Sequence, residues 1–338
     1  MCDPTRFPTM GADHNEGMDA VVTQKPSLDG AVALEDWGVI TATGPDAETF
    51  LQGQLTQDMR QLGTGAVRQA RLAGYCSAKG RLVASFVAWR LDDQTIALAC
   101  SSDLLPQTLK RLSMFVLRAK CRLADASAGW AVHGLAGSTA RLALAGPEKD
   151  AALPDAWSCV AQAQMSTIRL PDARGVVRAL QIRARESDSA FAPTMPRSAW
   201  DWLEVCSGVA RITAATTEAF VPQMVNLELT GGVNFQKGCY PGQEVVARSQ
   251  YRGTLKRRMF LATCEHPAPP AGADVFHSDD AQQPAGKVVL SAPSPAGGAV
   301  ALVELKTSLA YTPGTLTAGA TPLRLEDAQP YPLPVEAA

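Results

Sequence analysis

Histidine is scarce in this chain: only four of its 338 residues are histidine, at positions 14, 133, 266 and 277. A histidine-based hydrolase or metal centre would have to bring together positions that are far apart in sequence. Cysteines stand at 2, 76, 100, 121, 159, 206, 239 and 264, and no two have the Cys-x-x-Cys spacing of zinc and redox sites. The phosphate-binding pattern Gly-x-x-x-x-Gly-Lys-Ser/Thr is also absent, so nucleotide hydrolysis has no support.

The chain also lacks a secretory leader and any apolar run of the roughly twenty residues that cross a bilayer. We therefore expect no membrane partner, and a reducing, cytoplasmic environment in which the cysteines stay free. The net charge of −2 leaves no overall basic bias, so an RNA contact would need a local basic patch.

At 338 residues the chain exceeds the usual size of one domain, so two or three domains are expected. Its 46% hydrophobic and 19% charged residues are typical of a globular protein with a packed core. Residues 1–29 mix Pro, Gly, Met, Thr and Asp without apolar periodicity, which predicts a flexible lead. Met10 and Met18 offer later starts for the chain.

Residues 30–255 combine strands and helices in an irregular order, which predicts an α+β fold rather than a regularly alternating one. Extended runs are expected at 37–43, 70–78, 81–91, 95–100, 130–135, 166–170 and 176–183. Helices are expected after the break at 44–46, near 138–144, and from Arg197 to Gly208, which is a natural stop. Leu105, Leu109, Leu112 and Val116 predict one more helix, for which Ser101 and Ser102 are candidate caps.

Residues 256–338 are rich in short apolar runs, at 259–264, 274–277, 286–291, 299–306 and 322–326, separated by Pro- and Gly-rich turns. Short strands at this spacing predict a small β-barrel. The last residues, from about Asp327, include three prolines and are expected to lie over the surface.

One stretch combines a cysteine, a sharp turn and a helix start: Lys237, Gly238, Cys239, Tyr240, Pro241, Gly242, Gln243 and Glu244. Gly238 permits a tight reversal, and Pro241 suits the first position of a helix that would run to about Gly253. Cys239 would then lie at or just before a helix N-terminus, where the dipole and Lys237 favour a thiolate. Glu244 would either oppose or complement that effect. The alternative is that Cys239 is a small buried hydrophobic residue, as most free cysteines are.

Two tryptophans fall in the helix expected from Arg197. Trp200 and Trp202 are about 200° apart around a helix, so they cannot both face the same core. Trp202 shares an apolar stripe with Val205, Cys206 and Val209. This stripe assigns Trp202 to the core and leaves Trp200 for a surface, an interface or a pocket. Packing at a domain interface is the alternative for both Trp200 and Trp37.

The pattern Lys-Gly-Cys-Tyr-x-Gly-Gln-Glu at 237–244 resembles the signature of the YgfZ family of folate-binding proteins. Agreement extends to Leu-Glu-Asp-Trp at 34–37, Leu-Gln-Gly-Gln-Leu-Thr at 51–56, Phe-Val-Pro-Gln-Met-Val-Asn-Leu at 220–227, Val-Ala-Arg at 246–248 and Arg-Gly at 252–253. The resemblance covers about residues 32 to 338. It implies two interlocked α+β subdomains and a C-terminal β-barrel packed in a ring, as in the T-protein (aminomethyltransferase) of the glycine cleavage system.

The resemblance also implies binding of tetrahydrofolate or a derivative, and a role in iron–sulfur cluster maintenance and tRNA modification. In the family, aromatic residues at the positions matching Trp37 and Trp200 bind folate, although Trp200 and Trp202 could exchange roles. The leading hypothesis is a folate-binding accessory protein that maintains iron–sulfur enzymes, including those that modify tRNA, with Cys239 as its working thiol. The alternatives are a folate-dependent one-carbon transferase like the T-protein, and an interaction scaffold with a vestigial pocket.

The densest positive cluster comprises Arg248, Arg252, Lys256, Arg257 and Arg258. Most such clusters are solvated faces. The functional alternative is an anion site, either for the glutamate tail of folate or for RNA phosphate.

Overall fold

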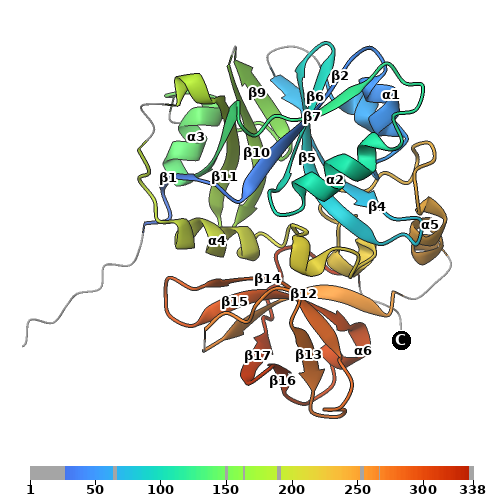
Figure 1. The fold of residues 1–338 in the computed structure, drawn as a ribbon. Helices are drawn as coiled ribbons and strands as arrows, with labels where there is room; N and C mark the ends of the chain where they lie inside the picture. Colours follow the sequence, from blue (N-terminus) through green and yellow to red (C-terminus); the bar gives the residue numbers. More distant parts are fainter. Residues whose placement is uncertain are drawn as a thin grey trace, which may run out of the picture.

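The computed structural model of the protein describes residues 27–63, 67–148, 151–162, 164–188, 192–251, 255–265 and 267–334. Its strands form a five-stranded sheet, a six-stranded sheet and a closed barrel. The two sheets lie side by side, the barrel lies beneath them, and helix α4 lies in between (Figure 1). The α+β class and the C-terminal barrel expected from the sequence are confirmed.

The five-stranded sheet is antiparallel throughout. Its strands, in spatial order, are β4 (Arg71–Cys76), β5 (Leu82–Asp92), β6 (Thr95–Ser101), β2 (Trp37–Thr43) and β7 (Arg122–Asp125). The interior strand β5 is buried at every position from Leu82 to Arg90, which shows that both faces of this sheet are covered there. Helix α2 (Leu105–Ser113) packs against β2 and β7.

The six-stranded sheet is interlocked with the first one. Its strands, in spatial order, are β1 (Gly30–Ala33), β8 (Trp130–Ala136), β11 (Val176–Ala184), β10 (Met165–Ala173), β9 (Ser158–Gln162) and β3 (Val67–Gln69). The chain therefore passes from the six-stranded sheet to the five-stranded sheet and back twice. Helix α3 (Gly137–Ala145) packs against β1, β8 and β11.

The expected flexible lead is shorter than residues 1–29. The carboxylate of Asp29 accepts hydrogen bonds from the backbone N–H and the hydroxyl of Thr139, both 3.0 Å long, in the first turn of α3. This contact ties Asp29 to the fold as a helix cap. Residues 1–26 lie outside the described part of the chain.

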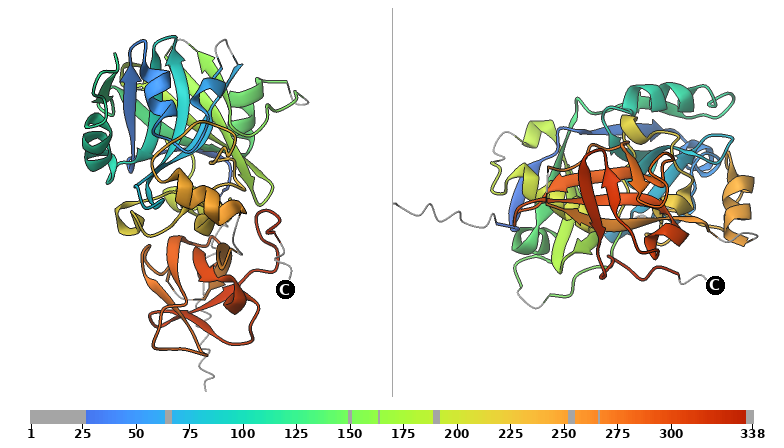
Figure 2. Two further views of the ribbon diagram at one scale, coloured as in Figure 1. Left: turned by 90° about the vertical axis from the view of Figure 1, so that its right-hand side faces the viewer. Right: turned by 90° about the horizontal axis from the view of Figure 1, so that it is seen from below.

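Helix α4 (Arg197–Cys206) connects the sheets to the barrel. It packs against β1 and β10 on one side and against β14 and β15 on the other. As expected, it stops at Gly208, whose φ of +72° is a conformation that favours glycine. The barrel strands, in spatial order, are β12 (Arg257–Cys264), β15 (Ala299–Lys306), β14 (Gly286–Pro293), β13 (Asp274–His277), β16 (Leu316–Ala318) and β17 (Thr321–Leu325). Figure 2 shows this barrel from two further directions.

The remaining helices are short. They are α1 (Ala47–Gln52), α5 (Gln243–Tyr251) and α6 (Thr307–Ala310), with 3-10 turns η1 (Met59–Gln61), η2 (Arg185–Ser187), η3 (Ala214–Thr216) and η4 (Pro222–Val225). The cap expected for α2 at Ser101 or Ser102 is wrong: the N-cap is Leu104, with no side-chain cap, and Ser101 accepts a hydrogen bond from Arg211 instead. Val116 lies beyond the end of α2. Within the described residues, no helix has the length and apolar character needed to span a membrane.

Candidate functional site

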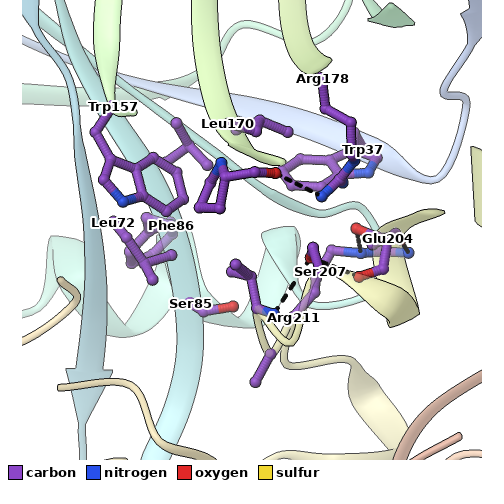
Figure 3. A pocket seen from close by; sticks show the side chains of 14 residues that line it. Trp37, Leu72, Ser85, Phe86, Trp157, Leu170, Arg178, Glu204, Ser207 and Arg211 are labelled. Atoms are coloured by element: carbon purple, nitrogen blue, oxygen red, sulfur yellow. Dashed lines mark hydrogen bonds and ion pairs between the residues drawn. The ribbon is translucent and has the colours of Figure 1, made fainter. Parts of the chain in front are cut away.

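A pocket lies where the two sheets and the segment after α4 meet. Its cavity volume is about 30 Å³, so the pocket is a narrow slot. Its walls are mostly apolar, with a few polar groups that converge on it (Figure 3). The lining residues are Trp37, Leu72, Ser85, Phe86, Val87, Trp157, Leu170, Pro171, Arg178, Glu204, Ser207, Val209, Ala210 and Arg211.

Of the charged side chains that line this slot, Arg178 has the fewest hydrogen-bond and ion-pair partners. It lies on β11 opposite Leu170, where the pairing of β10 is interrupted between Leu170 and Ala173 and Pro171 has no N–H to offer. Its guanidinium donates one long hydrogen bond of 3.4 Å to the carbonyl of Pro171, while its Nε–H is buried without a partner. Burial lowers the pKa of Arg178 to about 10. No ion pair joins this side chain to a carboxylate in the described part of the chain. Folding has already removed the Arg178 Nε–H from water, so a hydrogen-bond acceptor on a ligand in the slot would supply the partner that it lacks.

Arg211, by contrast, is fully engaged. It forms a two-point ion pair with Glu204, with distances of 3.0 and 3.1 Å, and a further ion pair of 2.9 Å with Asp36. Burial alone would raise the pKa of Asp36, but Arg197 and Arg211 outweigh it and lower that pKa. The guanidinium of Arg211 lies 5.1 Å from the centre of the Trp37 ring, a cation–π distance that fixes the indole at one end of the slot.

Trp157 lines the opposite side of the slot from Trp37 (Figure 3). Its φ is +68°, a strained conformation for a large side chain that costs on the order of 1 kcal/mol or more. Hydrogen bonds hold Trp157 in this conformation: its indole N–H donates to the carbonyl of Thr230 at 3.0 Å, and its backbone is hydrogen-bonded to Ala70 and Arg169. Strained residues of this kind cluster at functional sites.

The prediction that Trp200 is free of the core is wrong. Trp200 has no exposed surface, whereas Trp202 is half-buried. The Trp200 ring lies against Gly134, where an added Cβ would come within 2.5 Å of it, and the Arg178 guanidinium lies 4.8 Å from its centre. Trp200 therefore does not line the slot; it supports Arg178 from behind.

Lys237 is buried, with 5% of its surface exposed. Its ammonium group donates hydrogen bonds to the carbonyls of Gln52 and Leu55, at the C-terminal end of α1, and lies 4.9 Å from the centre of the Tyr240 ring. Burial lowers the pKa of Lys237 to about 8. Its main contacts thus anchor the motif to α1, which the sequence did not indicate.

Cys239 is exposed, whereas the other six cysteines of the described residues are buried or half-buried. None of the seven forms a disulfide. The alternative that Cys239 is a buried packing residue is therefore wrong. The helix expected to begin at Pro241 begins at Gln243, so Cys239 lies four positions before the helix rather than at its N-terminus. Glu244 is in the first turn of α5 and pairs with Arg248 at 3.0 Å.

The two glycines of the motif differ in their surroundings. A Cβ added to Gly238 would meet nothing within 4 Å, so the approach to Cys239 is open on that side. Gly242 has a φ of +76° and would place a Cβ 2.4 Å from the carbonyl of Ser77, in the turn between β4 and β5. Gly242 is therefore needed for packing, and it leaves no room for a partner to approach on that side.

Comparisons with known proteins identify the family. No protein-family model matches the chain. It is 36% identical over 251 residues to the tRNA-modifying protein YgfZ of Photorhabdus laumondii subsp. laumondii, covering 72% of this chain and 74% of that protein. It is 37% identical over 241 residues to the tRNA-modifying protein YgfZ of Edwardsiella ictaluri, covering 67% and 69%. The chain belongs to the YgfZ family.

A solved structure shows the fold of this YgfZ-family chain independently. The glycine cleavage system aminomethyltransferase T of Bartonella henselae matches it with a TM-score of 0.69 at 16% identity, over 91% of this chain and 88% of that one. The T-protein-like fold expected from the motif is therefore confirmed.

The expected basic cluster is largely dispersed in this YgfZ-family structure. Arg257 pairs with Glu304, and Arg258 is buried and pairs with Glu228. Arg248 pairs with Glu244 and Lys256 is exposed, while Arg252 lies outside the described residues. As a single anion site, the cluster is not supported.

Sequence reasoning missed Arg178, Arg211 and Trp157. A signal for Arg178 was available: it shares the period-two face of its strand with Leu180 and Ile182, both fully buried. A charged residue on such a face implies an unusual environment. Arg211 and Trp157 lie outside helices and strands and gave no comparable pattern.

Proposed function

We propose that the slot between the two sheets binds tetrahydrofolate or a derivative. The observation that carries this proposal is Arg178, a buried cation with an unused donor in a narrow, mostly apolar slot. Flat rings suit such a slot, and one convergent donor can orient them through a ring acceptor. Trp37 contacts the ligand directly, and Trp200 acts through Arg178.

The biological role that we propose is that of a folate-binding accessory protein for iron–sulfur enzymes in the cytoplasm, including enzymes that modify tRNA. Family membership and the names of the relatives support the link to tRNA. Cys239 is the proposed working thiol: it is exposed, it is held by a motif anchored through Lys237, and it does not line the slot. The folate site and the thiol site are therefore separable by mutation.

A one-carbon transferase is less well supported by the slot itself. The carboxylate that lines it belongs to Glu204, and Arg211 holds that group in a two-point ion pair. Both oxygens of this carboxylate already accept hydrogen bonds from Arg211, so neither is positioned to take a proton from a substrate.

The test combines two variants with two assays. Calorimetric titration with a panel of reduced folates should show binding to the wild type, weakened by about tenfold or more in Trp37→Ala and unchanged in Cys239→Ser. In cells that lack the protein, Cys239→Ser should fail to restore iron–sulfur enzyme activity. Trp202→Ala, outside the slot, is the control for the loss of a tryptophan. Normal folate binding by Trp37→Ala would overturn the assignment of the slot, and full rescue by Cys239→Ser would overturn the role of the thiol.

A further inference from the structure

An exposed apolar ledge follows helix α2. Met114, Phe115 and Leu117 are 61%, 46% and 86% exposed. Single exposed apolar side chains are normal, but three within four residues form a patch of the kind that marks an interaction site. None of them lines the slot.

The ledge is flanked by cations. Lys110 precedes it, Arg118, Lys120 and Arg122 follow it, and all four side chains are exposed. The sequence contains no Asp or Glu between Asp103 and Asp125. No ion pair neutralises these four cations within the described residues, whereas Arg248, Arg257 and Arg258 are each paired. We call Lys110, Met114, Phe115, Leu117, Arg118, Lys120 and Arg122 together the α2–β7 patch.

The α2–β7 patch has a fixed backbone. The N–H of Lys120 donates to the Asp46 carboxylate at 2.7 Å, and the N–H of Asp46 donates to the carbonyl of Lys120 at 3.3 Å. The segment then enters β7, which pairs with β2. Helix α2 lies at the outer margin of the molecule in both views of Figure 2. A preformed surface binds with less entropic cost than a loop that must be ordered.

We infer that the α2–β7 patch binds RNA, at a hairpin loop whose bases are unstacked. Cations on both sides of a short apolar ledge match a looped strand, in which phosphates flank bases that can stack on Phe115 and pack on Leu117. The chain carries a net charge of −2, so this positive region is local and steers a polyanion to this face. That the RNA is a tRNA rests on the proposed function.

RNA accounts for the patch better than a membrane does. Phe115 keeps more than half of its surface covered and Val116 is half-buried. Met114, Phe115 and Leu117 are the three exposed apolar side chains of this stretch, fewer than the apolar face of an interfacial helix presents to a bilayer.

The experiment measures fluorescence anisotropy of the full-length protein with an unmodified tRNA transcript and with an RNA duplex of equal length. The wild type should prefer the tRNA. Arg118→Ala with Lys120→Ala should weaken tRNA binding by about tenfold or more and reduce the slope of log K against log salt by about 1.4. Phe115→Ala with Leu117→Ser should abolish the preference for tRNA over duplex. Lys256→Ala with Lys306→Ala, two cations elsewhere, should change nothing.

Three results would overturn the inference: equal binding of tRNA and duplex by the wild type, unchanged tRNA binding in the patch variants, or binding of phosphatidylglycerol vesicles without binding of tRNA. Titration with tetrahydrofolate distinguishes a failure of this inference from a failure of the proposed function. The patch variants should bind the folate normally, and Trp37→Ala should lose the folate but keep the tRNA.

Discussion

Replacing Arg178 by Met should make the protein more stable and a poorer folate binder. A base whose pKa is lowered by folding destabilises the fold at every pH below that pKa, so the cost is fully present at pH 7. The fall in the pKa of Arg178 from 12.5 to about 10 corresponds to a cost on the order of 3 kcal/mol. The variant also loses the contact with Trp200 and one long hydrogen bond, which together offset about half of that gain.

The expected net effect on stability is a gain of about 1–2 kcal/mol, or a rise in melting temperature of roughly 3 °C. The expected effect on binding is a loss of about tenfold or more in folate affinity, because the donor in the slot is gone. Differential scanning calorimetry and isothermal titration on the same preparation measure the two quantities.

Arg211→Met is the matched control. Arg211 also lines the slot, but its removal leaves the buried Glu204 without its cation and Asp36 with Arg197 alone, so it should destabilise the fold by about 3–5 kcal/mol. If Arg178→Met proves less stable than the wild type, the energetic reasoning is refuted. If its folate affinity is unchanged, Arg178 does not contact the ligand.

Three further predictions concern other parts of the chain. The pKa of Lys237 is lowered to about 8, so between about pH 8 and 10.5 the unfolded chain binds more protons than the folded one. The free energy of unfolding should therefore rise with pH over that window. Urea unfolding at pH 7 and pH 9.5 should show this rise in the wild type and not in Lys237→Met. Trp200→Ala should cost about 3–5 kcal/mol, because Trp200 is fully buried, and should also weaken folate binding through Arg178; retained stability would contradict its placement. A chain that begins at Pro26 should melt at the temperature of the full chain, since the first ties to the fold in the described residues are the packing of Leu28 and the hydrogen bonds of Asp29. A lower melting temperature would show that residues 1–25 dock on the protein.

The strands that the sequence predicted are those with long apolar runs between turn residues, such as β2, β5 and β15. The strands that it missed are short and depend on their partners. Among the strands that the structure describes, β3, with three residues, pairs only with β9, and β7 pairs only with β2. Their extended conformation comes from the neighbouring strand rather than from local propensity.

The error over Trp200 has a physical cause. Assigning one tryptophan to the core assumed that the helix buries a single face. Helix α4 lies between a sheet and the barrel and buries Ala199, Trp200, Leu203, Glu204, Val205 and Cys206, which surround most of its axis. The motif at 237–244 could be found from sequence because its residues are contiguous, whereas the slot draws its lining from seven separate segments that only the fold brings together.

The alternation of the chain between the two sheets has a consequence for synthesis on the ribosome. Strand β1 pairs with β8, which is translated about 100 residues later, so at 5–20 residues per second β1 waits about 5–20 s for its partner. The five-stranded sheet is complete once β7 has emerged, before any strand from β8 to β11 exists. During that interval β1 and β3 are unpaired strands open to wrong partners. The slot acquires its Arg178 wall after that, and the segment from Glu204 to Arg211 last. The nascent chain therefore gains the ability to bind the proposed ligand only after the interlocking of the sheets is finished.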